Sequence, residues 1–134
     1  MINQIKSAGV FPTAISKILI VEDEPTLRMV VCEFLRLMNF EVTCAENGVE
    51  ALDRMCLTKF DLVITDVMMP NMGGVELIHN IRKVKPILPI IIVTGTDYEA
   101  AGELQDDFTK AIHKPYAFDH LLSKIYQFEV AYTD

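Results

Sequence analysis

The feature that most constrains the fold of this sequence is an alternation between short apolar runs and longer segments of helical period. The runs are rich in β-branched residues and read KILIV at 17–21, FEVTCA at 40–45, DLVIT at 61–65, PIIIV at 89–93 and FTKAIH at 108–113. Such alternation is typical of βα units, and right-handed crossovers between parallel strands place helices on both faces of one sheet. We therefore predict a doubly wound α/β domain of three layers.

A helix is expected after each run. Pro25 suits the first turn of the first helix, and Asn47 caps the second. The third opens at Gly73, residues 98–105 form a short and weaker fourth, and the last begins near Phe118. The helical positions expected to face the sheet are Leu27, Val30, Val31, Phe34, Leu35, Met38, Val49, Leu52, Met55, Leu77, Ile78, Ile81, Val84, Phe118, Leu121, Leu122 and Ile125.

Length and composition fit one globular domain. The chain has 134 residues, of which 51% are hydrophobic, so it can bury a core. Residues 1–16 have no sustained period and are interpreted as an N-terminal extension, residues 17–130 as the domain and residues 131–134 as a C-terminal tail.

Charge and hydropathy exclude some classes of function. The net charge of −7 argues against a nucleic-acid surface, and we interpret the short cationic cluster of Arg82, Lys83 and Lys85 as a solvated helix end. The longest apolar run, residues 87–93, is too short to span a bilayer. We expect a soluble, cytoplasmic protein with no membrane partner.

The cysteines have no metal-binding spacing. Cys32, Cys44 and Cys56 include no Cys-x-x-Cys pair. We expect three small buried hydrophobic side chains in a reducing compartment.

Polar residues follow the apolar runs. Glu22 and Asp23 follow the first run, Asp66 the third, Thr94 the fourth and Lys114 the fifth. Ligands of open parallel sheets bind beyond the carboxyl ends of the strands, so we expect these side chains to meet there.

This combination of groups predicts phosphoryl chemistry. Neighbouring carboxylates repel one another unless a cation intervenes, and oxygen ligands without Cys or His suit Mg²⁺. Lys114 would supply a fixed positive charge, Thr94 a hydroxyl donor, and Asp66 the nucleophile of a phosphoryl transfer.

Four short motifs carry a resemblance to a known family. They are VED at 21–23, DVMMPNMGG at 66–74, TG at 94–95 and KP at 114–115. In this order they resemble the receiver domain of bacterial two-component response regulators, over residues 17 to about 129. The resemblance implies a flavodoxin-like (βα)₅ fold with strand order 2-1-3-4-5 and a cis peptide bond before Pro115.

The resemblance also implies roles for single residues. Asp66 is the expected phosphorylated residue, and Asp23, Asp66 and the carbonyl of Met68 are the expected Mg²⁺ ligands, with Glu22 acting nearby. Thr94 is the expected switch hydroxyl and Lys114 its ion-pair partner.

The sequence departs from the family pattern at the switch. Ala111 stands where many members have a Tyr or Phe that rotates as the threonine moves, and a methyl group cannot do so. Tyr116 is interpreted as a packing residue. Gly73 replaces a frequent Asp, which alters the loop more than the chemistry.

The histidines and the loop methionines have simpler structural interpretations. His79 and His120 are expected on helix surfaces and His113 at a strand end, rather than in a phosphohistidine relay. Met68, Met69 and Met72 are expected to pack within their own loop.

Rival classes fit less well. An aspartate-nucleophile phosphatase needs Asp-x-Asp, but Val67 and Met68 follow Asp66. A flavodoxin-like cofactor carrier needs a phosphate loop where this chain has EDEP at 22–25. A degenerate receiver, acting as a phosphorylation-independent interaction module, remains the alternative.

The function expected from the sequence is signalling rather than enzymatic turnover. The receiver would take a phosphoryl group from a histidine kinase or histidine phosphotransfer protein and act on a downstream protein target. It would bind no nucleic acid directly, and the family also allows a homodimer.

Overall fold

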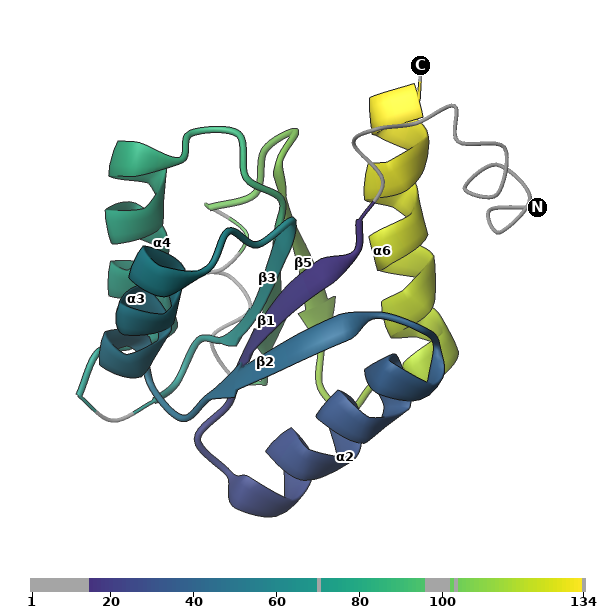
Figure 1. The fold of residues 1–134 in the computed structure, drawn as a ribbon, viewed down its shortest axis with the longest axis horizontal. Coiled ribbons are helices and arrows are strands. Elements are labelled where there is room, and N and C mark those ends of the chain that lie inside the picture. The colour runs from purple at the N-terminus through teal and green to yellow at the C-terminus, as the bar shows by residue number, and fades with distance from the viewer. Residues whose placement is uncertain (1–14, 70, 96–101, 103, 134) are drawn as a thin grey trace.

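The structure, a computed structural model, describes residues 15–69, 71–95, 102 and 104–133, without the side chains of 130–133. Figure 1 shows the ribbon. The strands are β1 (Lys17–Val21), β2 (Glu41–Ala45), β3 (Leu62–Asp66), β4 (Ile90–Thr94) and β5 (Thr109–His113). The helices are α2 (Pro25–Leu37), α3 (Gly48–Leu57), α4 (Gly74–Val84) and α6 (Phe118–Thr133).

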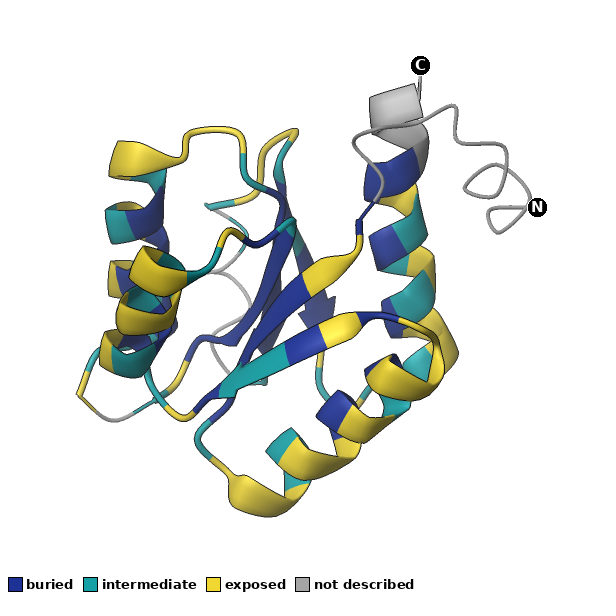
Figure 2. Cartoon of the chain, viewed as in Figure 1, coloured by how far each residue is buried: buried dark blue, intermediate teal, exposed yellow. Residues whose placement is uncertain are grey.

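The strands form one parallel sheet in the order β2-β1-β3-β4-β5. This order, and the placement of β2 and β5 at the edges, confirm the prediction of a doubly wound sheet. Helices α3 and α4 cover one face, and α2 and α6 cover the other (Figure 1). Because both faces are covered, β3 and β4 are buried along their whole length (Figure 2).

Side chains alternate between two cores. In β1, Ile18 and Ile20 pack with α2 and α6, whereas Leu19 and Val21 pack with α3 and α4. Successive strand residues point to opposite faces, so an apolar run with no polar interruption supplies both cores. This explains why the strand sequences show little alternation.

Helix starts follow the sequence signals. Pro25 is the first residue of α2, and its cap is the preceding Glu24, whose carboxylate accepts from the amides of Thr26 and Leu27. The side chain of Asn47 accepts from the amide of Glu50 at 2.9 Å, as predicted for α3. Both caps satisfy amides that lack partners within the helix.

Four of the predicted core positions are wrong. Val30, Met38, Val49 and Val84 are 40%, 40%, 49% and 72% exposed. Met38 caps the end of α2 and Val84 is the last residue of α4, so both lie at helix ends, whereas Val30 and Val49 are exposed within their helices. The stripe is narrower than the apolar pattern suggests (Figure 2).

Three predicted segments lie at or beyond the limits of the described residues. The short helix predicted at 98–105 falls largely outside the described residues. Helix α6 continues to Thr133 and so includes residues 131–133 of the predicted C-terminal tail. The extension at 1–16 likewise lies almost wholly outside the described part.

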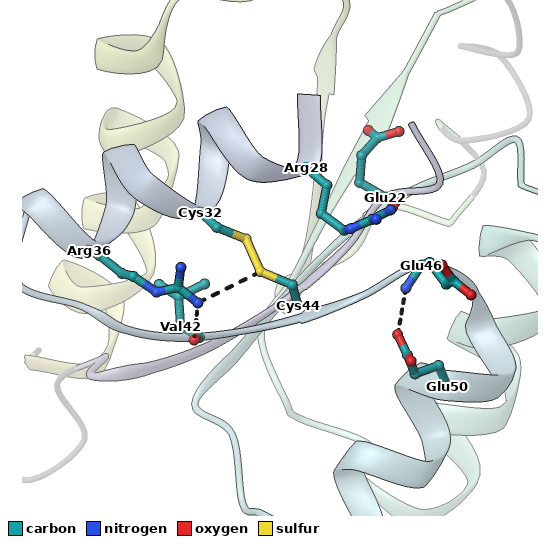
Figure 3. Close-up of a disulfide and its surroundings, with 8 residues drawn as sticks. All are labelled: Glu22, Arg28, Cys32, Arg36, Val42, Cys44, Glu46 and Glu50. Atoms are coloured by element: carbon teal, nitrogen blue, oxygen red, sulfur yellow. Dashed lines mark hydrogen bonds between the residues drawn. A yellow bond between two sulfur atoms is a disulfide. The ribbon is translucent and has the colours of Figure 1, made fainter. Parts of the chain in front are cut away.

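The expectation for the cysteines was wrong in two respects. Cys32 on α2 and Cys44 on β2 form a disulfide, because the helix packs over this edge strand (Figure 3). Arg36 lies beside it, with Nη2 donating to the carbonyl of Val42 at 3.0 Å. Cys56 is a free and exposed thiol rather than a buried one.

Arg82 also differs from its predicted role as a solvated cation. Its guanidinium donates to the carbonyls of Lys85, Leu88 and Phe108 and to the hydroxyl of Thr109, at 2.6 to 3.0 Å. Lys83 and Lys85 are exposed, as expected. Arg82 therefore joins the end of α4 to the starts of β4 and β5.

Candidate functional site

The predicted polar residues meet at the carboxyl edge of the sheet. Glu22 directly follows β1, Asp66 ends β3, Thr94 ends β4, and Lys114 directly follows β5. Backbone bonds keep the neighbouring strand ends together: the amide of Glu22 donates to the carbonyl of Ala45 at 3.0 Å, and that of Lys114 to the carbonyl of Thr94 at 2.7 Å.

Three carboxylates form a cluster there. Glu22, Asp23 and Asp66 each offer an oxygen within 4.8 Å of the other two. Glu22 and Asp66 are buried, at 7% and 6% exposure, while Asp23 is more open. One Glu22 oxygen accepts from the amide of Glu24 at 3.1 Å, so the cap residue of α2 also orients this carboxylate.

Lys114 is the cation that faces this cluster. Its Nζ lies 2.7 Å from Oδ2 of Asp66 and 3.7 Å from Oε1 of Glu22. Burial lowers the pKa of Lys114, but the hydrogen bond and charge of Asp66, with the charges of Glu22 and Asp23, outweigh burial and raise it above its ordinary value. The ammonium group therefore stays charged at neutral pH.

Glu22 is the carboxyl group whose proton affinity is most altered. Burial and the charge of Asp66 raise its pKa from 4.5 to about 7, against the opposing effects of the Glu24 amide and Lys114. A single lysine thus does not fully offset the repulsion between the carboxylates. A divalent cation at the cluster would do so.

The backbone turns directly after Asp66 and contacts its carboxylate. The amide of Met68 donates to Oδ1 at 3.3 Å, and the amide of Gly74 donates to the carbonyl of Val67 at 2.9 Å. Gly74 approaches the strand so closely that a Cβ there would collide with the carbonyl oxygen of Asp66. Glycine at 74 is required for this loop to close.

Thr94 and Ala111 lie on adjacent strands. The hydroxyl of Thr94 is fully buried and has no hydrogen-bond partner among the described residues. Ala111 is 5% exposed, belongs to the core under α3 and α4, and its amide donates to the side chain of Gln105 at 3.0 Å. The roles predicted for both residues in a switch stay predictions.

An apolar pocket borders the site next to Lys114. It is lined by Leu27, Lys114, Pro115, Tyr116 and Phe118, and the Lys114–Pro115 bond is cis. Tyr116 packs against the core as predicted. Burial and the charges of Glu22 and Asp66 raise the pKa of Tyr116 to about 12, so its hydroxyl stays protonated.

The histidines and the loop methionines were predicted to have structural roles. His79, His113 and His120 are exposed, in keeping with their predicted surface positions. Met68 is 61% exposed, whereas Met69 and Met72 pack against the core. Among the described residues, no helix is both long and apolar enough to cross a membrane.

One residue of the site was missed by the sequence analysis. Arg28 of α2 donates through Nη1 to the backbone carbonyls of Glu22 at 2.7 Å and Asp23 at 3.3 Å. A signal was present: a cation near the N-terminal end of a helix opposes the helix dipole and needs another reason to be there.

The donor set suits a hard divalent cation. Three carboxylates, two of them buried, with no Cys or His among them, match the oxygen ligands that Mg²⁺ prefers. The carbonyl of Met68 follows Asp66 closely in the loop and is the remaining donor predicted for such a site.

A doubly wound sheet with an acidic cluster and a lysine at its carboxyl edge defines the class of signal-receiver domains. The chain belongs to the response regulator receiver domain family, whose profile matches residues 18–126.

Curated relatives include both regulators and a sensor. The response regulator MprA of Mycobacterium sp. (strain KMS) is 32% identical over 111 residues, which cover 81% of this chain and 48% of that protein. The sensor protein EvgS of Escherichia coli (strain K12) is 36% identical over 115 residues, or 82% of this chain and 10% of that protein. The chain thus spans about half the length of such regulators.

Solved structures agree with this membership. A receiver domain protein from Clostridium thermocellum has a TM-score of 0.81 at 28% identity, over 87% of this chain and 95% of that one. The response regulator TrrA from Thermotoga maritima, in complex with Mg²⁺-BeF, has a TM-score of 0.76 at 34% identity, over 84% and 98%. The receiver domain of the hybrid histidine kinase CckA has a TM-score of 0.72 at 29% identity, over 85% and 99%.

Proposed function

We propose that this receiver domain accepts a phosphoryl group on Asp66, with Mg²⁺ held by the acidic cluster, from the phosphohistidine of a partner protein. The observation that carries the proposal is the 2.7 Å contact between Lys114 and Asp66 beside two further carboxylates. TrrA, a family relative of similar fold, was solved with Mg²⁺-BeF, which supports the same chemistry here.

The transfer forms one bond and breaks another. A carboxylate oxygen of Asp66 attacks phosphorus, the phosphorus–nitrogen bond breaks, and the electron pair remains on the partner's imidazole. Lys114 holds the attacking carboxylate and stands where charge on the phosphoryl oxygens needs a counterion. A bound Mg²⁺ supplies charge neutralisation for the phosphoryl oxygens.

Glu22, Asp23, Asp66 and the carbonyl of Met68 are the residues proposed to hold the ion. Glu22 is anchored by the Glu24 amide, so it enters the site in a fixed orientation. Thr94 is proposed to donate its buried hydroxyl to the phosphoryl group, because that hydroxyl has no acceptor among the described residues.

The signal is proposed to pass through protein contacts in the cytoplasm, from a histidine kinase or a histidine phosphotransfer protein to a downstream target. Receiver domains in this family occur in regulators and in a hybrid histidine kinase, which supports partners of this kind. We propose neither direct binding of nucleic acid nor enzymatic turnover of a separate substrate.

A second candidate rests on Ala111. Its methyl group cannot report the state of Thr94 by rotation. An interaction module that works without phosphorylation needs no such rotating side chain, so alanine at this position would not impair it. The acidic cluster and its lysine favour the phospho-acceptor.

The test is the intact mass of the protein after incubation with acetyl phosphate, with and without Mg²⁺. We expect a Mg²⁺-dependent gain of one phosphoryl group in the wild type and in Asp53→Asn, an exposed aspartate of α3 that serves as the matched control. Asp66→Asn should show no gain. A wild type that gains nothing, or an Asp66→Asn variant that still gains, would refute the assignment.

A further inference from the structure

Arg28 occupies an unusual place for a cation. It is the fourth residue of α2, and its half-buried side chain runs back to the end of β1, beside Glu22 (Figure 3). Helical side chains lean toward the helix N-terminus, which lets Arg28 reach the loop before the helix. Since the helix dipole disfavours a cation here, its contacts must offset that cost.

Those contacts are to backbone, not to carboxylates. Nη1 donates to the carbonyl oxygens of Glu22 and Asp23, at 2.7 and 3.3 Å. Within the described part of the chain, no carboxylate lies close enough to Arg28 to form an ion pair.

This geometry separates two tasks. The guanidinium binds the peptide units that carry the acidic pair, while the carboxylates of that pair stay available to another cation. The Glu24 amide constrains the same loop through Oε2 of Glu22. Arg28 thus fixes the backbone of the loop, and the Glu24 amide fixes the side chain of Glu22.

We propose that Arg28 is a positioning residue of the metal site: by binding two consecutive carbonyls, it holds Glu22 and Asp23 in the orientation that binds Mg²⁺. The inference rests on the metal-binding part of the proposed function. Groups that orient metal ligands typically change metal affinity by about 10- to 100-fold when removed.

A role as a charge alone would act in the opposite direction. Removing a cation from the neighbourhood of three carboxylates strengthens their attraction for Mg²⁺. Removing a device that orients the ligands weakens it. The sign of the change in Mg²⁺ affinity therefore distinguishes positioning from electrostatics.

The experiment measures the Kd for Mg²⁺ alone, without a phosphodonor, by following amide chemical shifts in a titration at constant ionic strength. We expect Arg28→Met to bind Mg²⁺ about 10-fold more weakly than the wild type. Arg28→Lys keeps the charge and one donor group, so it should recover part of the loss. Arg54→Met, which removes an exposed cation from α3, should leave the Kd within about twofold.

Stability is measured on the same variants by chemical denaturation. If Arg28→Met loses stability but keeps the wild-type Kd, Arg28 serves the fold and the inference is wrong. Tighter Mg²⁺ binding in Arg28→Met would also overturn it, in favour of a charge effect. Should Arg28→Met fail to fold, Arg28→Lys decides the matter, because a positioning role requires weaker Mg²⁺ binding at unchanged charge.

Failure of the proposed function looks different. If the wild type binds Mg²⁺ but gains no phosphoryl group, the phospho-acceptor assignment fails while the Kd values still judge Arg28. If the wild type shows no Mg²⁺-dependent shifts at the cluster, the metal site and the role of Arg28 fail together.

Discussion

The sheet has one edge where the amino ends of its strands lie and another where their carboxyl ends lie, and charged side chains have opposite roles at the two. At the amino edge, Arg82 donates to four oxygen atoms and Asp61 accepts from the amides of Ser16 and Lys17. At the carboxyl edge, three carboxylates face one another, and Lys114 is the one cation paired with them among the described residues. The charged groups at the amino edge are thus satisfied by hydrogen bonds, whereas the carboxylates at the carboxyl edge have too little positive charge near them.

The difference teaches how a small domain separates stability from chemistry. A charge bound by backbone groups stabilises loops but has no capacity left for a ligand. A cluster with too little positive charge costs free energy and attracts a cation. Arg28 is intermediate, since it is bound by backbone yet stands beside the acidic cluster.

Among changes that test this comparison of the two edges, Arg82→Met is expected to have the largest effect on stability. The change leaves several oxygens without their donor, so we expect the free energy of unfolding to fall by about 3 kcal/mol. The folded variant should still take one phosphoryl group, because Arg82 lies at the far edge. Chemical denaturation checks the first expectation and intact mass the second.

Lys83→Met, on the neighbouring exposed residue, should change stability by less than about 0.5 kcal/mol. Equal effects of both changes would contradict the structural role of Arg82.

A somewhat smaller effect is expected from Gly74→Ala. The added methyl group would collide with the backbone of Asp66, which should lower the free energy of unfolding by about 2 kcal/mol and slow phosphorylation. Gly73→Ala is the matched control, since its Cβ would meet the carbonyl oxygen of Val67 at 3.4 Å. Its cost should stay below about 1 kcal/mol. Denaturation and the rate of mass gain test the pair, and similar rates in both variants would refute the close-approach argument.

The smallest effect is expected from Glu22→Gln in Mg²⁺-free buffer. The folded-state pKa of Glu22, about 7, lies above its ordinary value of 4.5, so proton binding favours the folded state and stability falls as pH rises between these values. Glutamine does not titrate, and the variant should therefore gain on the wild type as pH rises from 5 to 8. We expect a difference of about 1 kcal/mol. Denaturation at both pH values measures it, and Glu33→Gln, on the exposed face of α2, gives the baseline. A pH-independent difference would contradict the raised pKa.

Most of the fold could be predicted because the strands are continuous apolar runs. The runs predicted the five strands to within a residue or two, and the polar residues after them predicted Glu22, Asp66, Thr94 and Lys114 at one edge. Their meeting follows from the parallel sheet itself, because the carboxyl ends of parallel strands share an edge.

What could not be predicted depends on side-chain reach. Arg82 and Arg28 are flexible side chains whose partners are mostly backbone carbonyls, and carbonyls have no signature in a sequence. The pairing of Cys32 with Cys44 depends on how α2 lies over β2, which no spacing specifies. Val49 and Val84 failed as core residues because apolar composition does not show where a helix stops being covered.

The contacts of Arg82 also bear on the order of folding. Its bonds to Phe108 and Thr109 span 26 and 27 residues, so they require β5 to have joined the sheet already. Contacts between distant segments pay for loop closure before they form, and those that form last mainly govern the rate of unfolding. The contacts of Arg82 at the amino ends of the strands would then raise the barrier to unfolding and set the lifetime of the folded state. The acidic cluster at the carboxyl ends would contribute little to that barrier.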